Sequence, residues 1–321
     1  MQPVFNQWPV VRVFYSDHFV LPLPEGHKFP MAKYAKLRER ILGERIVSAP
    51  DVEEAPLASL DDLRLVHDTG YVDAVLNGTV PREVQRRIGF PWSPQMVERA
   101  RRSVGATIAA ANAAIEDGIA ANLAGGTHHA FADRGEGYCV FNDVAVGVRV
   151  LQRDSSIGQG GTGRAIRRVL VIDLDVHQGN GTASIFADDD DVFTFSMHGE
   201  KNFPFKKERS NLDVALPDGT ADAAYLDLLR FHLDDVLNRH RPDFVFYLAG
   251  ADPFHGDRLG RLKLTIEGLR QRDEMVLHAC TRARLPLALS MSGGYAADVD
   301  SIVTIHTNTI RVAASLCSIG V

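Results

Sequence analysis

The chain has 321 residues, of which 45% are hydrophobic and 24% charged, so it is long enough to bury one large α/β core or two small ones. Its net charge of −6 and pI near 6.1 exclude the broadly basic character of a general nucleic-acid binder. The three cysteines are Cys139, Cys280 and Cys317, and because they form no CxxC pair they indicate neither a disulfide framework nor a cysteine zinc site. No signal-peptide pattern opens the sequence and no run of about 18 apolar residues occurs, which predicts a cytoplasmic protein without a membrane span.

Short apolar segments alternate along the chain with longer segments of helical periodicity. Nearly continuous Val, Ile, Leu and Phe runs are typical of strands buried on both faces, so they predict an α/β fold with a parallel sheet covered by helices. No repeat or linker divides the pattern, and we expect a single domain over residues 1–321. The expected strands are 10–16, 168–176, 191–197, 243–251 and 285–294, and the expected helices are 98–117, 143–152, 222–239, 266–283 and 299–316.

Two adjacent histidines, His128 and His129, lie in the glycine-rich segment GGTHHAFADRGEGYCVFND, residues 125–143. Glycine allows close approach and unusual backbone angles, so such a loop suits a site where two rings are aimed at one point. A histidine pair alone is more often a surface or core coincidence. It becomes a catalytic candidate when carboxylates elsewhere complete a constellation.

A second glycine pattern, Gly158, Gly160 and Gly163, matches the G-x-G-x-x-G dinucleotide fingerprint. The fingerprint requires a strand before it and a helix after it, whereas here a helical pattern precedes and an apolar strand follows. We therefore interpret residues 155–165 as a surface loop rather than a nucleotide site.

Charged residues gather after the expected strands. Asp173, Asp175 and His177 recur at period two, so on an extended segment their side chains project from one face. Buried, unpaired charges cost several kcal/mol, so they require a cation or a strong hydrogen-bond network. Ligands of open α/β sheets bind beyond the carboxyl ends of strands, where Asp252 and the turn Ser292–Tyr295 also lie.

An aspartate after a strand is also a common helix cap, which explains Asp252 alone as well as a site does. A capping role does not explain why Asp173, Asp175 and His177 are expected at the same edge of the sheet as Asp252. Asp175, His177 and Asp252 form an oxygen and nitrogen ligand set that suits a divalent metal and leaves positions open for water and substrate.

Ordered motifs then point to a known family. The chain carries HKFPMAKY (27–34), GGTHHAFADRGEGYC (125–139), DLDVHQGNG (173–181), GADPFHGDRLG (250–260) and SGGY (292–295). Together they resemble the zinc-dependent histone deacetylase superfamily, and their spacing is similar to its bacterial and class IV branch. The resemblance implies the arginase/deacetylase fold, with a central, mostly parallel sheet of about eight strands, and hydrolysis of an N-acyl-lysine or similar amide at a metal in a narrow tunnel.

Residue roles follow from the same resemblance. It implies Zn²⁺, or Fe²⁺, held by Asp175, His177 and Asp252, and catalysis by His128, His129 and Tyr295 with Asp173 and Asn180 as partners of the two histidines. Tunnel and substrate contacts would come from Tyr138, Phe203, Gly137 and Gly294, and a structural K⁺ or Na⁺ would lie near Asp173, Asp175, His177, Ser196 and Met197. His129 would be the general base and acid, and Tyr295 would stabilise the oxyanion.

Three alternatives stay open beside N-acyl-lysine hydrolysis. Many lysine deacetylases carry Phe where this chain has Tyr138, a difference shared with relatives that act on acetylated polyamines, so acetylpolyamine hydrolysis is the runner-up. A dimanganese ureohydrolase shares the fold, but it would place a carboxylate where Gly179 stands. An inactive acyl-lysine-binding module would have lost a catalytic residue, and none of those named is missing.

Overall fold

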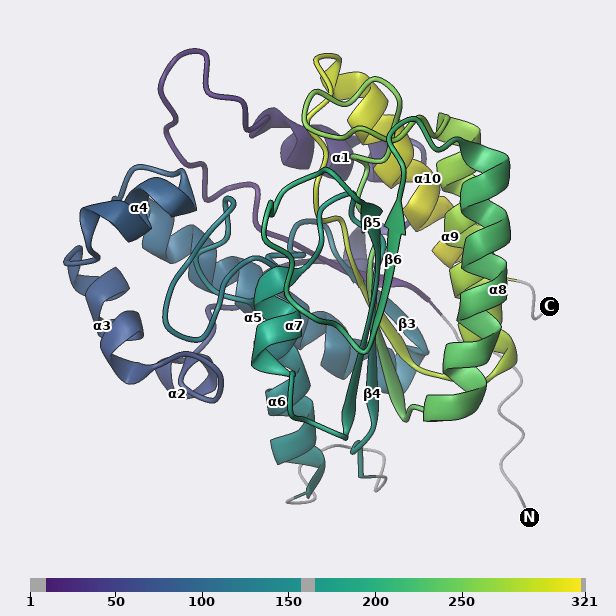
Figure 1. The fold of residues 1–321 in the computed structure, drawn as a ribbon, viewed down its shortest axis with the longest axis horizontal. Coiled ribbons are helices and arrows are strands. Elements are labelled where there is room, and N and C mark those ends of the chain that lie inside the picture. The colour runs from purple at the N-terminus through teal and green to yellow at the C-terminus, as the bar shows by residue number, and fades with distance from the viewer. Residues whose placement is uncertain (1–9, 157–164, 319–321) are drawn as a thin grey trace.

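The computed structural model describes residues 10–156 and 165–318. At its centre is an eight-stranded sheet in the order β2-β1-β3-β8-β7-β4-β5-β6 (Figure 1). Every neighbouring pair of strands is parallel, which confirms the predicted fold class. The strands are β1 Arg12–Tyr15, β2 Val52–Glu54, β3 Ile119–Asn122, β4 Val169–Asp173, β5 Val192–Gly199, β6 Leu212–Leu216, β7 Phe244–Leu248 and β8 Leu287–Ser290.

Ten α-helices lie in the described parts of the chain. They are α1 Ala32–Gly43, α2 Leu60–Leu63, α3 Thr69–Asn77, α4 Arg82–Ile88, α5 Pro94–Asp117, α6 Asp143–Ser156, α7 Asn180–Ile185, α8 Asp222–His240, α9 Ile266–Arg282 and α10 Val299–Ser318. None of them combines the length and the apolar character that crossing a bilayer requires.

All five expected strands and all five expected helices are present, and every expected strand except β5 is shorter than expected. The sequence patterns missed β2, β3 and β6. Strand β3 has only four residues, IAAN, and follows the long helix α5 directly after Gly118, so its two alanines give it no β-rich apolar run to detect. The glycines Gly158, Gly160 and Gly163 lie outside the described residues.

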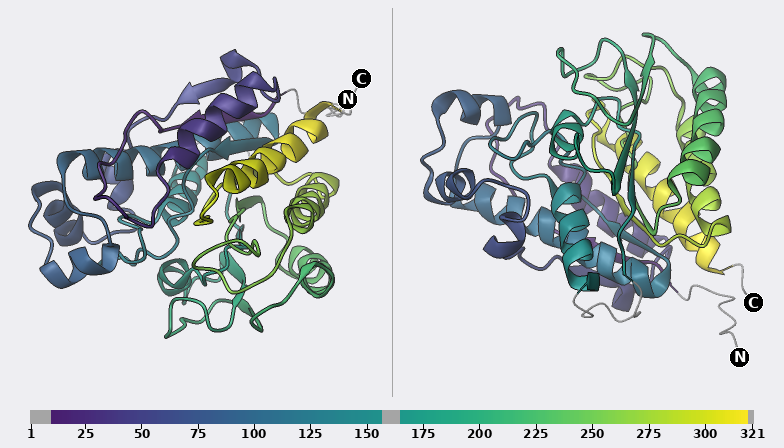
Figure 2. Two further views of the ribbon diagram at one scale, coloured as in Figure 1. Left: turned by 90° about the horizontal axis from the view of Figure 1, so that it is seen from above. Right: turned by 60° about the horizontal axis from the view of Figure 1, so that its bottom comes forward.

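Helices cover both faces of the sheet. Within β4, Leu170 and Ile172 pack into the cluster formed with α1, α8, α9 and α10, whereas Val169 and Val171 pack against α5 and α6. The two helical layers lie on opposite sides of the strands (Figure 2). Burial on both faces explains why β4 is apolar without alternation. Helices α2, α3 and α4 build a separate apolar cluster against α5, at one side of the molecule (Figure 1).

The strand order decides where the polar residues meet. Strands β3, β8, β7 and β4 are direct neighbours, and the segments that follow them carry the tandem histidines, the SGGY turn, Asp252 and the Asp173–His177 segment. Because parallel strands end at the same edge, four segments distant in sequence meet there.

One expectation about this edge was wrong. Strand β4 ends at Asp173, so Asp173, Asp175 and His177 do not lie on one face of a continuous strand. The Asp175 amide instead donates to the Asp173 carboxylate, 3.2 Å away, and the chain bends after the strand. Bending, rather than strand alternation, places Asp175 and His177.

A buried ion pair lies behind this edge. Arg272 and Asp273 of α9 are fully buried and their side chains are 2.8 Å apart. The Arg272 Nη1 donates to the carbonyls of Gly250 (2.6 Å) and Leu174 (3.4 Å), in the segments that carry Asp252 and Asp175. Asp273 also accepts from the hydroxyls of Tyr247 and Thr309. Helices α9 and α10 are thereby tied to the segments that carry the polar residues.

Asp273→Ala should lower the free energy of unfolding by about 3–5 kcal/mol, because it leaves the buried Arg272 guanidinium without its carboxylate. Chemical denaturation measures the change. The matched control is Asp235→Ala, which removes the partner of the exposed Arg239 on α8 and should change stability by less than about 1 kcal/mol. Equal losses for the two variants would contradict the role of the buried pair.

Candidate active site

The glycine-rich loop after β3 is held by one aspartate. Asp143, the first residue of α6, accepts hydrogen bonds from the amides of Gly126 (2.9 Å) and Thr127 (2.7 Å) and from the Thr127 and Thr107 hydroxyls. Gly126 has φ +71°, which favours glycine. These hydrogen bonds fix the backbone of the loop immediately before His128.

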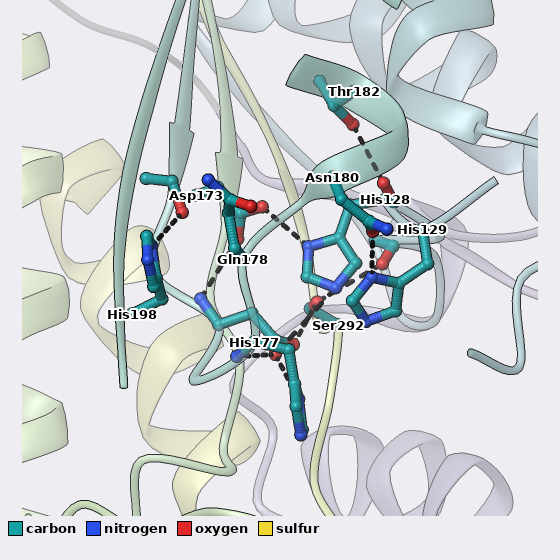
Figure 3. Close-up of polar contacts among 12 residues, drawn as sticks. His128, His129, Asp173, His177, Gln178, Asn180, Thr182, His198 and Ser292 are labelled. Carbon is teal, nitrogen blue, oxygen red and sulfur yellow. Dashed lines mark hydrogen bonds and ion pairs between the residues drawn. The ribbon is translucent and has the colours of Figure 1, made fainter. Parts of the chain in front are cut away.

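The tandem histidines have different partners (Figure 3). His128 Nδ1 lies 2.6 Å from a carboxylate oxygen of Asp173, and His129 Nδ1 lies 2.7 Å from Oδ1 of Asn180. Since the Asn180 oxygen can only accept, His129 donates through Nδ1 and keeps a lone pair on Nε2. Both rings are almost fully buried, and their centroids are 4.1 Å apart.

Their surroundings separate the two pKa values. Burial lowers the pKa of His128, but the charges of Asp173 and Asp175 outweigh it and raise the pKa to about 9. Burial lowers the pKa of His129 well below its usual range, and the neighbouring His128 and His177 lower it further. The site therefore pairs a charged imidazole with a neutral one.

Asp175, His177 and Asp252 form the second part of the site. One ligand atom from each lies within 4.8 Å of the others, the one such group of three among the described residues. His177 Nδ1 is 3.0 Å from Oδ1 of Asp175 and 3.2 Å from Oδ2 of Asp252. These separations are near the roughly 3.3 Å between ligand atoms of a tetrahedral site with bonds of about 2.0–2.1 Å.

The cluster fits a divalent cation. Asp252 is 0% exposed and its Oδ2 makes no hydrogen bond with any described residue. Burial and the negative charge of Asp175 raise the pKa of Asp252 to about 7. A cation between the two carboxylates would neutralise their mutual repulsion and give Oδ2 of Asp252 a partner. It would thereby offset the cost of burying two negative charges.

Neighbouring groups fix the orientation of the carboxylates. Oδ2 of Asp175 accepts from the Ser292 hydroxyl (2.7 Å) and the Gly293 amide (2.8 Å), and Oδ1 of Asp252 accepts from the Val176 amide (2.9 Å). A Cβ at position 293 would lie 1.9 Å from Oδ2 of Asp252. The SGGY turn thus packs directly against the cluster, and glycine is required there for space.

Tyr295 follows this turn, with 8% of its surface exposed. Its amide donates to Asp257 (2.6 Å) and its carbonyl accepts from Arg258 (2.7 Å), so the backbone is held on both sides. No described residue hydrogen-bonds its hydroxyl, and Tyr295 lines two spaces beside the cluster. Burial raises the pKa of Tyr295 well above its usual value, so the hydroxyl stays a donor.

Two connected spaces meet at the cluster. An inner cavity of about 70 Å³ and an outer pocket of about 780 Å³ share His129, Gly137, Tyr138, His177 and Tyr295 in their linings. Phe203 lines the outer pocket, with its ring 4.9 Å from that of His129. A Cβ on Gly137 would lie 2.5 Å from the His129 ring.

Most residues that the sequence singled out meet around these spaces. Of the residues expected to contact substrate, Gly294 is the exception, because it lines neither space and a Cβ there would contact Ile302 and Ala251. Asp173 and Asp252 lie behind the lining, in contact with His128 and His177. Ser196 and Met197 lie on β5, beside the end of β4, where Ser196 is paired with Asp173 in the sheet register. The residues expected around the monovalent ion are therefore neighbours at the ends of β4 and β5.

Several residues that shape the site carry no role predicted from the sequence. Asp143 closes the same motif as the histidines, and its place before a helical pattern was a readable capping signal. Asp257 and Arg258 belong to the GADPFHGDRLG motif but had no assigned role. Arg99, which lines the inner cavity from α5, had no signal beyond one charge on a face of small residues.

Comparison with known proteins agrees with this geometry. The family model described as histone deacetylase domain matches residues 27–310. An uncharacterized protein of Picosynechococcus sp. is 46% identical over 301 residues, covering 94% of this chain and 97% of that protein. Histone deacetylase 2 of Arabidopsis thaliana is 30% identical over 297 residues, covering 89% and 74%. Acetoin utilization protein AcuC of Bacillus subtilis is 32% identical over 238 residues, covering 67% and 59%.

A solved structure shows the same fold. The crystal structure of an HDAC homolog from Aquifex aeolicus superposes with a TM-score of 0.80 at 22% identity, covering 96% of this chain and 84% of that one. The parallel sheet covered by helices makes the chain an α/β protein, and the Asp175–His177–Asp252 cluster gives it a candidate divalent-cation site. It belongs to the histone deacetylase family, whose members are amide hydrolases.

Gly293→Ala should lower the affinity for a divalent metal by about 10- to 100-fold. The new methyl group would overlap the carboxylates of Asp175 and Asp252 and push them out of position. Metal titration against a chromogenic chelator measures the affinity. The control is Gly70→Ala in α3, where a Cβ meets nothing within 4 Å. Unchanged metal affinity in a folded Gly293→Ala protein would argue against this cluster as the metal site.

Proposed function

We propose that this chain is a zinc-dependent hydrolase that removes acyl groups from N-acyl-lysine side chains. The observation that carries the proposal is the convergence of the Asp175–His177–Asp252 cluster, the two imidazoles and the Tyr295 hydroxyl on one pair of connected spaces. Residues 1–321 would act as one catalytic domain. Iron(II) is the alternative metal, since the ligand set suits both.

Amide hydrolysis needs help at the carbonyl and at the leaving amine. Zinc held by Asp175, His177 and Asp252 would supply Lewis acidity to the carbonyl and to the attacking water. His129, neutral because its pKa is low, accepts the proton of the water through Nε2 and returns a proton to the leaving amine. Asn180 holds the ring in the tautomer that this role requires.

His128 and Tyr295 act on charge. His128, whose pKa is raised to about 9, keeps a proton and positions the water while Asp173 balances its charge. Tyr295 donates its free hydroxyl to the carbonyl oxygen as negative charge develops there. Tyr138 and Phe203 form walls for the extended alkyl chain of the substrate.

The outer pocket favours lysine over polyamine. Its lining contains more cationic than acidic side chains: Arg87, Arg134, Lys201, Lys206 and Arg261 against Glu136 and Glu208. Three of the arginines pair with acidic residues that do not line the pocket, Glu83, Asp133 and Asp218, so the lining itself stays more cationic than acidic. A polyamine keeps further positive charges after acylation, and a cationic mouth repels them. An acyl-lysine peptide brings a neutral amide and a chain of variable charge, so it meets no such penalty. The K⁺ or Na⁺ expected beside Asp173 stays a prediction.

A substrate panel tests the proposal. Acetyl-, octanoyl- and myristoyl-lysine peptides are compared with N-acetylated polyamines, with kcat/KM measured for each. We expect at least one acyl-lysine peptide to exceed every polyamine by about tenfold or more, and a strong chelator to abolish all turnover because the open metal positions receive the reactants. Faster turnover of a polyamine would favour the runner-up, and full turnover by metal-free protein would exclude the mechanism.

Tyr295→Phe separates catalysis from packing, because it keeps the ring and removes only the hydroxyl. We expect kcat to fall by about 10² or more while metal content and thermal stability stay near those of the wild type. Tyr225→Phe is the control, since that tyrosine is fully buried in the core. If Tyr295→Phe keeps kcat within about threefold, Tyr295 does not stabilise the oxyanion.

A further inference from the structure

Arg99 is a buried cation without a partner. It lies on α5, is 8% exposed, and makes no hydrogen bond or ion pair with any described residue. Its Nη1 is completely buried. The guanidinium carbon lies 4.6 Å from the centre of the Tyr34 ring, so the contact that positions the side chain is a cation–π interaction.

The inner cavity receives this side chain. Met96, Arg99, Ala100 and Ser103 share one face of α5 and line the cavity, whose other wall includes the tandem histidines and Tyr295. Arg99 therefore borders the same space as Asp175 and His177 of the metal cluster. Arg99 does not line the outer pocket, whose lining includes Phe203 and the five cationic side chains named above.

An unpaired buried guanidinium is costly, since its desolvation is not repaid. Arg272, the other deeply buried arginine described above, has both a carboxylate and carbonyl acceptors. Arg99 has neither. The carboxylate that lines the cavity with it, Asp175, is already bonded by Ser292, Gly293 and His177. An anion that enters the cavity would supply the partner that Arg99 lacks.

We propose that Arg99 binds the terminal carboxylate of the acyl group, so that the substrates include lysine amides of short dicarboxylic acids such as succinate and glutarate. The inference rests on the proposed function, in which the scissile carbonyl lies at Tyr295 and the lysine leaves through the outer pocket. The acyl chain then points into the inner cavity toward Arg99. Water adds across the amide C–N bond, and the products are the free lysine amine and the dicarboxylic acid.

Matched peptides test the charge at the end of the chain. Glutaryl-lysine and pentanoyl-lysine peptides have acyl chains of equal carbon number and differ in the terminal carboxylate. Arg99→Gln should lower the ratio of their kcat/KM values, glutaryl over pentanoyl, by about 10- to 100-fold, the usual effect of losing a charge-assisted hydrogen-bond pair. Arg99→Met is a second variant that also removes the charge.

Arg101→Gln is the matched control. Arg101 lies on the same helix, but its guanidinium donates to the Ala58 carbonyl and does not line the cavity. It should leave the ratio within about threefold of the wild-type value, which is below the effect of a charge-assisted bond. If Arg99→Gln and Arg99→Met lower both peptides equally, Arg99 serves product release or cavity shape and the proposal is wrong.

Measuring peptide binding without turnover tests the carboxylate site independently of the proposed hydrolysis. In a His129→Ala background, calorimetry gives the Kd of each peptide without turnover. A glutaryl peptide that binds about 10-fold or more tightly than its pentanoyl match, and loses this advantage with Arg99→Gln, supports the carboxylate site even if the wild type hydrolyses neither. Equal Kd values for the two peptides overturn the inference, whatever the wild type hydrolyses.

Discussion

Burial of two carboxylates and an imidazole within a few ångströms of one another is the constraint on which the rest of the structure depends. Asp175 and Asp252 repel one another in a region where water cannot screen them. The surrounding fold answers with hydrogen-bond donors to three of the four oxygens, from backbone amides and a serine hydroxyl. The fourth, Oδ2 of Asp252, is left for a cation.

The same constraint reaches the scaffold. Gly250 and Gly293 leave room for the carboxylates, since a Cβ at either position would lie within 3 Å of them. On the opposite side, Arg272 ties the carbonyls of the two ligand-bearing segments to α9. The site is therefore held by groups from at least three sheet-edge segments and one helix, and its geometry is not a local property of any one of them.

A second organising feature is the unequal treatment of similar side chains. Burial, with the neighbouring His128 and His177, lowers the pKa of His129, whereas the charges of Asp173 and Asp175 outweigh burial and raise the pKa of the adjacent His128. Arg272 and Arg99 differ in the same way, because one is paired within the fold and the other faces a cavity. The Arg272 guanidinium has a structural role because the fold supplies its partners, whereas the partner proposed for the Arg99 guanidinium is a ligand.

The sequence by itself determined the fold class, the long helices, the five apolar strands and, through ordered motifs, the family. These depend on periodicity and local residue order, which one chain records directly. It could not supply the short, alanine-containing strand β3, the bend after Asp173, or the separation of Gly294 from the cavity. Nor could it show that Asp143 anchors the histidine loop or that Arg99 lacks a partner, because pairing and burial depend on residues far apart in sequence that only the packed sheet and helices bring together.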